Sequence, residues 1–364
     1  MSLSPAAITT IGSFPGTDIW ETSRIVRGEL PDFPALPELA ARGPGADMVG
    51  RALGLLAGVS PEFCGQTTPS GWRLTSQTTT DFPRAMRRAA SWLSEDLDAA
   101  EREWSQYKGP FKIQLAGPWT IAATVELQNG ERMLSDIGAR RDLAGAMNEA
   151  VRLHIADVAK RLPNADIVVQ VDEPSVPAVL AGRIQTQSGW SAHKPVEVPD
   201  AQGTLRELFT AVGNAGAVPA IHCCGRRPPL RVFREAGAKL VSIDLTLGNT
   251  ASAADDDEIG QLLDEGLILM AGLASSIPSQ VPHQKGTAAL LAPLLGVLSH
   301  LGIPYQDAAS QVVLTPTCGL PGAGSMDRVR SILADLAAAS RAMRDVVGDS
   351  ALRDQEAERR REQS

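Results

Sequence analysis

Residues 221–225 read IHCCG, and they place one imidazole and two thiols in three consecutive positions of a chain with five His and four Cys. Imidazole nitrogen and thiolate sulfur are donors that zinc prefers. Side chains two residues apart on a strand point the same way, so we expect His222 and Cys224 to face one side and Cys223 the other. The spacing predicts two donors of a metal site, and the alternative is a buried, thiol-rich strand end.

Two other strand candidates end in residues that would complete such a site. The run 239–245 ends near Asp244, and the run 312–319 ends near Cys318. One imidazole, two thiolates and one carboxylate form a tetrahedral set that suits Zn²⁺. A metal in this electron-rich set activates water poorly, but it can hold an incoming thiol as a thiolate. The alternative for Asp244 is a cap on the following turn, and for Cys318 it is a buried structural thiol.

The scaffold must bring these strand ends to one place. Short apolar runs, most of them nearly continuous as in strands covered on both faces, alternate with helical patterns along the chain. The eight strand candidates are residues 8–14, 71–77, 111–117, 166–173, 218–224, 239–245, 267–273 and 312–319. This alternation predicts an α/β fold: a single (β/α)8 TIM barrel with extra helices and with its active site at the C-terminal ends of the strands.

Composition narrows the class of protein. The 364 residues, 43% of them hydrophobic, allow one barrel at residues 1–350, and the charged residues 351–364 are expected to fray into solvent. The formal net charge of −8 argues against a nucleic-acid or anionic-membrane partner. No run approaches the roughly 20 apolar residues of a membrane span, and the first residues lack the basic start of a secretory signal. The four cysteines do not suggest a disulfide framework, so we expect a cytoplasmic protein.

Six short motifs follow one another along the chain: IGSFP, QLAGPWTIA, VVQVDEP, IHCC, VSID and LTPTCGL. No single motif is specific, but the ordered set covers nearly the whole chain and resembles the catalytic C-terminal barrel of the cobalamin-independent methionine synthase family. That family transfers a methyl group to the sulfur of homocysteine. Its longer members carry a second, N-terminal barrel, so this chain is similar to a short, core-type relative.

The resemblance implies a zinc site and a site for the amino acid. The implied zinc ligands are His222, Cys224, Asp244 and Cys318, with Asp244 where the family usually has Glu. The implied contacts to the substrate carboxylate are Ile11, Gly12 and Ser13. Backbone N–H groups suit that task because hydrogen bonds to a charged group are strong. The implied catalytic-site partner of the substrate ammonium is Asp172, whose alternative role is to favour a helix N-terminus.

Three departures from the family leave parts of the reaction open. The family has a histidine after the seventh strand as a proposed proton donor, whereas LASSIPS has none here and His283 is the nearest candidate. Thr124 stands near the place of a tryptophan that packs on the pterin of folate. The family's second carboxylate for the substrate amine has only Glu62 as a candidate. The methyl donor is therefore open between methyl-folate and a methylated corrinoid protein.

We therefore expect a zinc-dependent methyltransferase that methylates the thiol of homocysteine, with Zn²⁺ as its cofactor. One alternative is a zinc thiol alkyltransferase acting on another thiol, such as coenzyme M. Another is a catalytically degenerate barrel that binds zinc or a thiol. Cys64 is expected to be a buried thiol, His154 a core or interface histidine, and Trp119 a packing residue that could also line the pocket.

Overall fold

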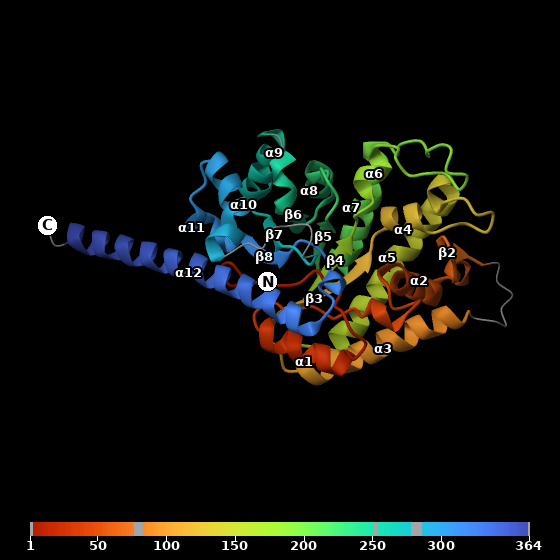
Figure 1. The fold of residues 1–364 in the computed structure, drawn as a ribbon, viewed down its shortest axis with the longest axis horizontal. Coiled ribbons are helices and arrows are strands. Elements are labelled where there is room, and N and C mark those ends of the chain that lie inside the picture. Colours follow the sequence, from red (N-terminus) through yellow and green to blue (C-terminus); the bar gives the residue numbers. More distant parts are fainter. Residues whose placement is uncertain (1–2, 76–82, 251–252, 278–285, 363–364) are drawn as a thin grey trace.

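The structure, a computed structural model, describes residues 3–75, 83–250, 253–277 and 286–362. Its centre is a curled sheet of six parallel strands that pair in sequence order (Figure 1). The strands are β3 (Gly109–Ala116), β4 (Ala165–Asp172), β5 (Val218–Cys223), β6 (Leu240–Asp244), β7 (Ile268–Ala274) and β8 (Val312–Pro316). All six coincide with predicted runs, because strands that are buried on both faces are nearly continuous in apolar residues.

Helices cover the outside of the sheet (Figure 1). The longer ones are α1 (Ile19–Glu29), α2 (Met48–Val59), α3 (Arg84–Trp104), α5 (Ile137–Arg161), α7 (Val198–Asn214), α9 (Ala253–Asp264), α10 (Thr287–His300) and α12 (Met326–Glu362). The shorter ones are α4 (Pro118–Thr124), α6 (Val176–Leu180), α8 (Leu230–Ala236) and α11 (Tyr305–Ala308). A helix follows every strand from β3 to β8. The residues that follow the six strands therefore gather at one end of the sheet.

Two extended segments lie between the edge strands β8 and β3. Residues 7–14 pair with β8, residues 33–38 pair with β3, and the two segments pair with each other. The contacts are the isolated parallel bridges Ile8–Leu314, Ala35–Lys112 and Ser13–Glu38. Single bridges do not make a ladder, so the described residues form a curled six-stranded sheet with two added segments. Within the described part of the chain, the strands do not form the complete eight-stranded barrel that we predicted.

The prediction that residues 71–77 form the second barrel strand is wrong. β1 (Gly65–Thr68) and β2 (Gly71–Leu74) form an antiparallel hairpin apart from the six-stranded sheet, and residues 76 and 77 lie outside the described ranges. Residues 33–38 lie beside β3 instead, within the sequence LPDFPALPEL. Prolines lack the N–H group that a ladder needs. This explains both the isolated bridges and the absence of a strand pattern in the sequence.

Side chains from seven segments fill the interior of the curl. They are Ala7, Phe33, Val168, Ala220, Leu240, Met270 and Val313. Two residues further along β4, β5 and β6, the buried positions become polar: Gln170, His222 and Ser242. Because side chains two apart on a strand share a direction, an apolar floor lies beneath a polar layer at the C-terminal end of the sheet.

α12 holds the N-terminal segment in place. Ser340 Oγ donates to the Ala6 carbonyl at 2.6 Å, and Arg344 Nε donates to the Pro5 carbonyl at 2.8 Å. The helix continues to Glu362, and its distal part extends away from the body in Figure 1. The segment that we expected to fray is thus helical as far as it is described, whereas the domain boundary at residue 350 stays a prediction.

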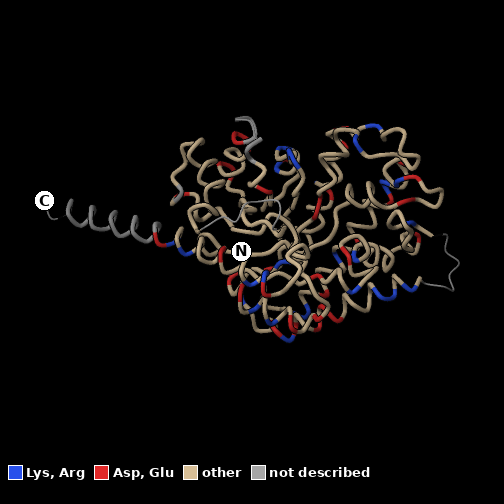
Figure 2. Tube along the Cα trace, in the orientation of Figure 1, with Lys and Arg blue, Asp and Glu red and all other residues tan. Residues whose placement is uncertain are grey.

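Charged residues of both signs are interspersed along α1 and α3 (Figure 2). Pairs such as Arg27–Glu103 and Arg161–Asp98 join neighbouring helices.

Within the described ranges, no helix is both long enough and apolar enough to cross a membrane.

Candidate metal and substrate site

Three predicted metal ligands converge at the C-terminal end of the sheet. His222 lies on β5, Cys224 directly follows β5, and Cys318 follows β8. Their candidate donor atoms all lie within 4.8 Å of one another, and the two sulfur atoms are 3.4 Å apart. Cys223 is completely buried in the apolar core, so the predicted alternation of side chains along β5 is confirmed.

The His222 ring has one bonded and one unbonded nitrogen. Nδ1 lies 2.9 Å from Ser242 Oγ on the neighbouring strand β6. Nε2 is buried and has no hydrogen-bond partner within the described part of the chain. A buried polar atom without a partner is costly. A metal ion at the cluster would give this nitrogen a partner.

The two thiols of the cluster differ in acidity. The hydrogen bond with Cys224, assisted by His222, outweighs burial and lowers the pKa of Cys318 to about 4. The same contact, with burial, raises the pKa of Cys224. The pair thus favours a thiolate on Cys318 over one on Cys224. A cation bound between them would favour the second thiolate as well.

Asp244, the expected fourth ligand, is not part of the converging group. Its Oδ1 accepts hydrogen bonds from Thr246 N at 2.8 Å and from Thr246 Oγ1 at 2.6 Å. Burial raises the pKa of Asp244, and the bonds from Thr246 oppose that shift. The carboxylate thus caps the turn after β6, which is the alternative that the sequence left open. Its role as a metal ligand stays a prediction.

The Ile11–Gly12–Ser13 segment presents free backbone donors. The N–H groups of these residues donate to no acceptor among the residues that the structure describes. Gly12 has φ +135°, and a Cβ there would lie 2.4 Å from Gln114 Cδ, so the position requires glycine. Ser13 lies against Gly319, where a Cβ would be 2.4 Å from Ser13 Oγ. The segment therefore lies beside the Cys318 end of the cluster.

Asp172 ends β4 directly opposite His222 in the strand register. Its side chain is buried, and Oδ1 accepts a hydrogen bond from Gln170 Nε2 at 2.7 Å. Burial raises the pKa of Asp172 to about 6, while His222 and Lys112 oppose the shift. A buried carboxylate beside the cluster is suited to bind a cationic group of a ligand.

A second buried carboxylate, which the sequence did not indicate, belongs to Glu38. The backbone of Glu38 forms a parallel β-bridge with Ser13, and its Oε2 lies 3.5 Å from Arg51 Nε. Burial raises the pKa of Glu38 to about 7 against the effect of Arg51, and the charge of Asp172 adds to the rise. Glu62, the candidate taken from the sequence, is exposed. The proline-rich stretch around Glu38 has no strand pattern that would have marked it.

Glu173, next to Asp172, supports a helix. It is completely buried and accepts hydrogen bonds from Trp119 N at 2.9 Å, Thr120 N at 2.7 Å and Thr120 Oγ1 at 2.6 Å. These groups belong to the first turn of α4, where a carboxylate is favourable. A Cβ at Gly117 would lie 2.4 Å from Glu173 Cδ, so glycine there makes room for the cap. Burial raises the pKa of Glu173 to about 7 despite these bonds.

Other residues singled out in the sequence have packing roles or lie outside the described ranges. Cys64 is buried. Trp119 is buried, and its Nε1 donates to the Ala201 carbonyl at 3.2 Å. Thr124, half-buried at the end of α4, donates to the Thr120 carbonyl at 2.6 Å. His283 lies outside the described residues, so its catalytic role stays a prediction.

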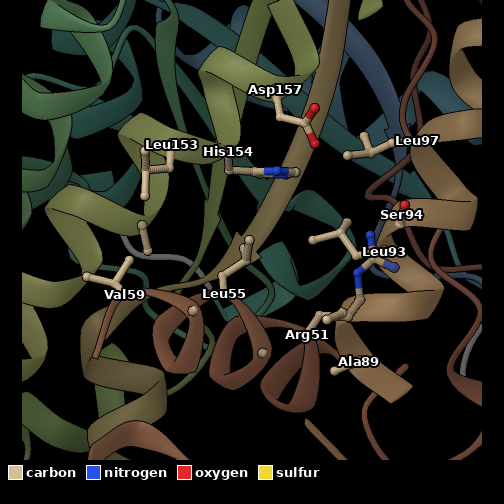
Figure 3. Close-up of a pocket in the computed structure, with 14 residues that line it drawn as sticks. Arg51, Leu55, Val59, Ala89, Leu93, Ser94, Leu97, Leu153, His154 and Asp157 are labelled. Carbon is tan, nitrogen blue, oxygen red and sulfur yellow. The ribbon is translucent and has the colours of Figure 1, made fainter. Parts of the chain in front are cut away.

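His154 belongs to a different part of the molecule. It is 5% exposed on α5 and borders a cleft of about 270 Å³ between α2, α3 and α5 (Figure 3). Burial, followed by the charge of Arg51, lowers the pKa of His154 to about 4. None of the converging metal donors lines this cleft. His154 is thus a buried core residue.

Comparison of the sequence with protein-family models and with curated proteins finds no match. Among solved structures, the fold is similar to that of a B12-independent methionine synthase from Shewanella sp. W3-18-1 in complex with selenomethionine. The TM-score is 0.59 at 12% identity, covering 94% of this chain and 99% of that chain. A methylaspartate ammonia lyase from Clostridium tetanomorphum gives a TM-score of 0.43 at 10% identity, covering 95% of this chain and 61% of that chain. The resemblance to methionine synthases is thus supported at the level of fold.

Proposed function

We propose that the protein is a zinc-dependent methyltransferase that transfers a methyl group to the thiol of homocysteine and forms methionine. The observation that carries the proposal is the convergence of His222, Cys224 and Cys318, with an unpartnered imidazole nitrogen among them. The likeness in fold to a B12-independent methionine synthase supports the proposal in architecture.

The donor set suits Zn²⁺. Two thiolates on a tetrahedral zinc ion with Zn–S bonds of about 2.3 Å lie about 3.8 Å apart, and the sulfur atoms of Cys224 and Cys318 lie 3.4 Å apart. Calcium and magnesium prefer oxygen ligands. Three protein donors would leave one position for a ligand, as is usual in catalytic zinc sites. When bound there, zinc would favour the thiolate form of an added thiol.

The groups around the cluster suit the two charged ends of an amino acid. The free N–H groups of Ile11, Gly12 and Ser13 are donors for a carboxylate. Asp172 and Glu38 are buried acceptors for an ammonium group. Charges interact more strongly in a buried site than in water. Homocysteine carries both groups and therefore matches this site better than a thiol with a single anionic group.

The reaction depends mainly on positioning. The homocysteine sulfur, after its proton has passed to solvent, forms a bond to the methyl carbon while the bond between that carbon and the donor breaks. The electron pair of the broken bond stays with the demethylated donor. Binding the amino acid at both of its charged ends fixes the sulfur relative to the donor, which lowers the entropic part of the activation barrier. Methyl-folate and a methylated corrinoid protein both remain candidate donors.

Methionine formation tests the proposal. Zinc-loaded protein is incubated with homocysteine and, in separate reactions, with methyl-folate, methylcobalamin or a methylated corrinoid protein, and methionine is measured by mass spectrometry. We expect methionine with one of these donors and none above background with Cys224→Ser. Cys223→Ala is the matched control, because Cys223 is buried in the core beside the same strand end, and it should keep the activity.

Calorimetric titration separates the rival functions. Binding of coenzyme M more tightly than homocysteine would favour an alkyltransferase that acts on that thiol. Binding of homocysteine without transfer from any of the donors would favour a barrel that binds thiols without catalysis. Either result would contradict the proposed function.

A further inference from the structure

Two buried side chains hold the Ile11 carbonyl from inside the sheet. Lys112 Nζ on β3 and Gln170 Nε2 on β4 each donate a hydrogen bond to this oxygen at 2.8 Å. Both side chains are completely buried. Gln170 Nε2 also donates to Asp172 Oδ1 at 2.7 Å. The same amide group thus joins the segment proposed for the substrate carboxylate to the carboxylate proposed for the substrate ammonium.

These bonds fix the direction of the Gly12 N–H. No peptide bond in the described ranges is cis, so the Ile11 carbonyl and the Gly12 N–H, which share one peptide plane, point in opposite directions. Fastening the carbonyl to Lys112 and Gln170 turns the Gly12 N–H away from them. The next peptide plane, between Gly12 and Ser13, is held separately, because Glu38 N donates to the Gly12 carbonyl at 2.9 Å.

Among the residues that the structure describes, no backbone N–H donates to the Ile11 carbonyl. The nearest backbone hydrogen bonds lie on either side of Ile11. Thr9 N donates to the Leu314 carbonyl, and the Gly12 carbonyl accepts from Glu38 N. In a regular barrel strand the ladder would fix every peptide plane. Here the segment makes isolated bridges, and inward-facing side chains from β3 and β4 supply the missing contacts.

Lys112 has no second polar partner among the described residues that would explain its burial. Within the described ranges, its side chain forms no ion pair, and its hydrogen-bond partner is the Ile11 carbonyl. Burial lowers the pKa of Lys112 to about 7, and the charges of Asp172 and Glu38 oppose that shift. Placing a lysine in a sheet interior is costly unless the charge and the donors are used. The contact with the Ile11 carbonyl gives the buried Lys112 side chain a use beneath the site.

We propose that Lys112 is a positioning residue for the substrate carboxylate. It fastens the Ile11 carbonyl so that the Gly12 N–H faces the carboxylate of the bound amino acid, and Gln170 couples the same carbonyl to Asp172. This inference rests on the proposed function and assigns a role to a residue that none of the sequence motifs marked as functional.

Three thiols that differ in one charged group test the inference. Homocysteine carries both groups, 4-mercaptobutanoate lacks the ammonium, and 3-mercaptopropylamine lacks the carboxylate. Their affinities are measured by calorimetry on zinc-loaded wild type and Lys112→Met. We expect Lys112→Met to weaken the two carboxylate-bearing thiols by about tenfold or more, the effect of one charge-assisted hydrogen bond. The affinity for 3-mercaptopropylamine should change less than about twofold.

Two further variants make the test specific. Gln170→Leu should weaken all three thiols, because Gln170 contacts both the Ile11 carbonyl and Asp172. Thr315→Val is the matched control, since Thr315 is completely buried on β8 and its hydroxyl has no partner in the described structure. It should bind all three thiols as the wild type does. Zinc content and circular dichroism are recorded for each protein, and Lys112→Gln replaces Lys112→Met if the latter does not fold.

The outcomes distinguish the inference from the proposed function. Equal weakening of all three thiols by Lys112→Met, or no weakening, would overturn the role of Lys112 while leaving the thiol site intact. A zinc-loaded wild type that binds none of the three thiols would overturn the proposed function and the inference with it. Selective loss of the carboxylate-bearing thiols would support both.

Discussion

His222 is bonded at one ring nitrogen and unbonded at the other, and this difference defines what it can do. Nδ1 lies 2.9 Å from Ser242 Oγ, and Nε2 is buried without a described partner. Histidines that ligate metals usually bond through the second nitrogen to a neighbouring group, which fixes the ring and its tautomer. Ser242 occupies that supporting position here.

Ser242→Ala should therefore weaken zinc binding without abolishing it. Loss of the hydroxyl leaves the His222 ring free to rotate and its tautomer unselected, and loss of such a supporting bond commonly costs about 10- to 100-fold in metal affinity. Competition with a chromophoric zinc chelator measures the affinity. Thr315→Val, which removes another buried hydroxyl from the sheet interior, should keep wild-type affinity. Equal affinity of Ser242→Ala and wild type would show that Nδ1 needs no such support.

Residues of the site differ in how far the sequence could indicate them. His222 and Cys224 are predictable because alternation within one short strand is a local property. Gln170 and Asp172 also alternate within an apolar strand, a sign that polar side chains point inward. Their partners could not be predicted, because the Ile11 carbonyl lies 159 residues from Gln170 in the sequence. Glu38 has no local signal, since only the folded chain brings it beside Ser13.

At the scale of elements, hydrogen bonds between the end of β4 and the first turn of α4 join the site to the outer helices. Glu173 directly follows Asp172 and accepts three hydrogen bonds from the first turn of α4. Two of the donors are backbone N–H groups that would have no intrahelical partner. One dipeptide therefore supplies a carboxylate to the site and a cap to α4, the helix that follows the neighbouring strand β3.

Glu173→Ala should lower the free energy of unfolding by about 2–3 kcal/mol, because buried N–H groups of α4 would lose their acceptor. Glu173→Gln keeps an amide oxygen as acceptor and should lose less. Urea denaturation at pH 7 measures both variants. Equal stability of Glu173→Ala and Glu173→Gln would contradict the capping role. Zinc content should be unchanged in Glu173→Gln, because Glu173 is not among the converging donors.

The elements that the sequence indicated correctly are those with a strong local pattern. Strands β3 to β8 read as apolar runs because both of their faces are covered. The run 71–77 (GWRLTSQ) has only two apolar residues and is the weakest of the eight patterns. It begins in a hairpin, because the partner of a strand is decided by the whole fold. Residues 33–38 are rich in proline and escape detection, although they bridge β3 to the N-terminal segment.

At the scale of the whole molecule, the site depends on segments from both ends of the chain. The Ile11–Ser13 segment lies beside β8, and α12 holds the residues before it through Ser340 and Arg344. On the other side, Arg51 of α2 pairs with Glu38 and with the buried Asp96 of α3. Burial of several charged groups makes stability depend on pH.

His154 provides a clean test of this dependence. The folded state keeps its imidazole neutral down to about pH 4, whereas the unfolded chain takes up a proton near pH 6.5. Acidification from pH 7 to pH 5 should therefore destabilise the wild type through His154 by about 2 kcal/mol. His154→Leu lacks this contribution, so its stability should fall less over the same range. The buried carboxylates act in the opposite direction, because the folded state keeps their protons at higher pH, but both proteins share them.

Urea denaturation of the two proteins at pH 7 and pH 5 gives the comparison. Arg51 and Asp157 are the charged groups that act on His154, and both are kept in the variant. An equal change in stability with pH in the two proteins would contradict the neutral, buried state of His154.

Metal content is the measurement that tests the central claim most directly. Protein purified under reducing conditions without added metal is analysed by elemental mass spectrometry, with Cys318→Ser and Cys223→Ala beside the wild type. The proposed site predicts about one zinc ion per chain in the wild type, its loss in Cys318→Ser and its retention in Cys223→Ala. A well-folded wild type that contains no metal, even after zinc is supplied, would contradict the account and leave the converging thiols as a buried strand end.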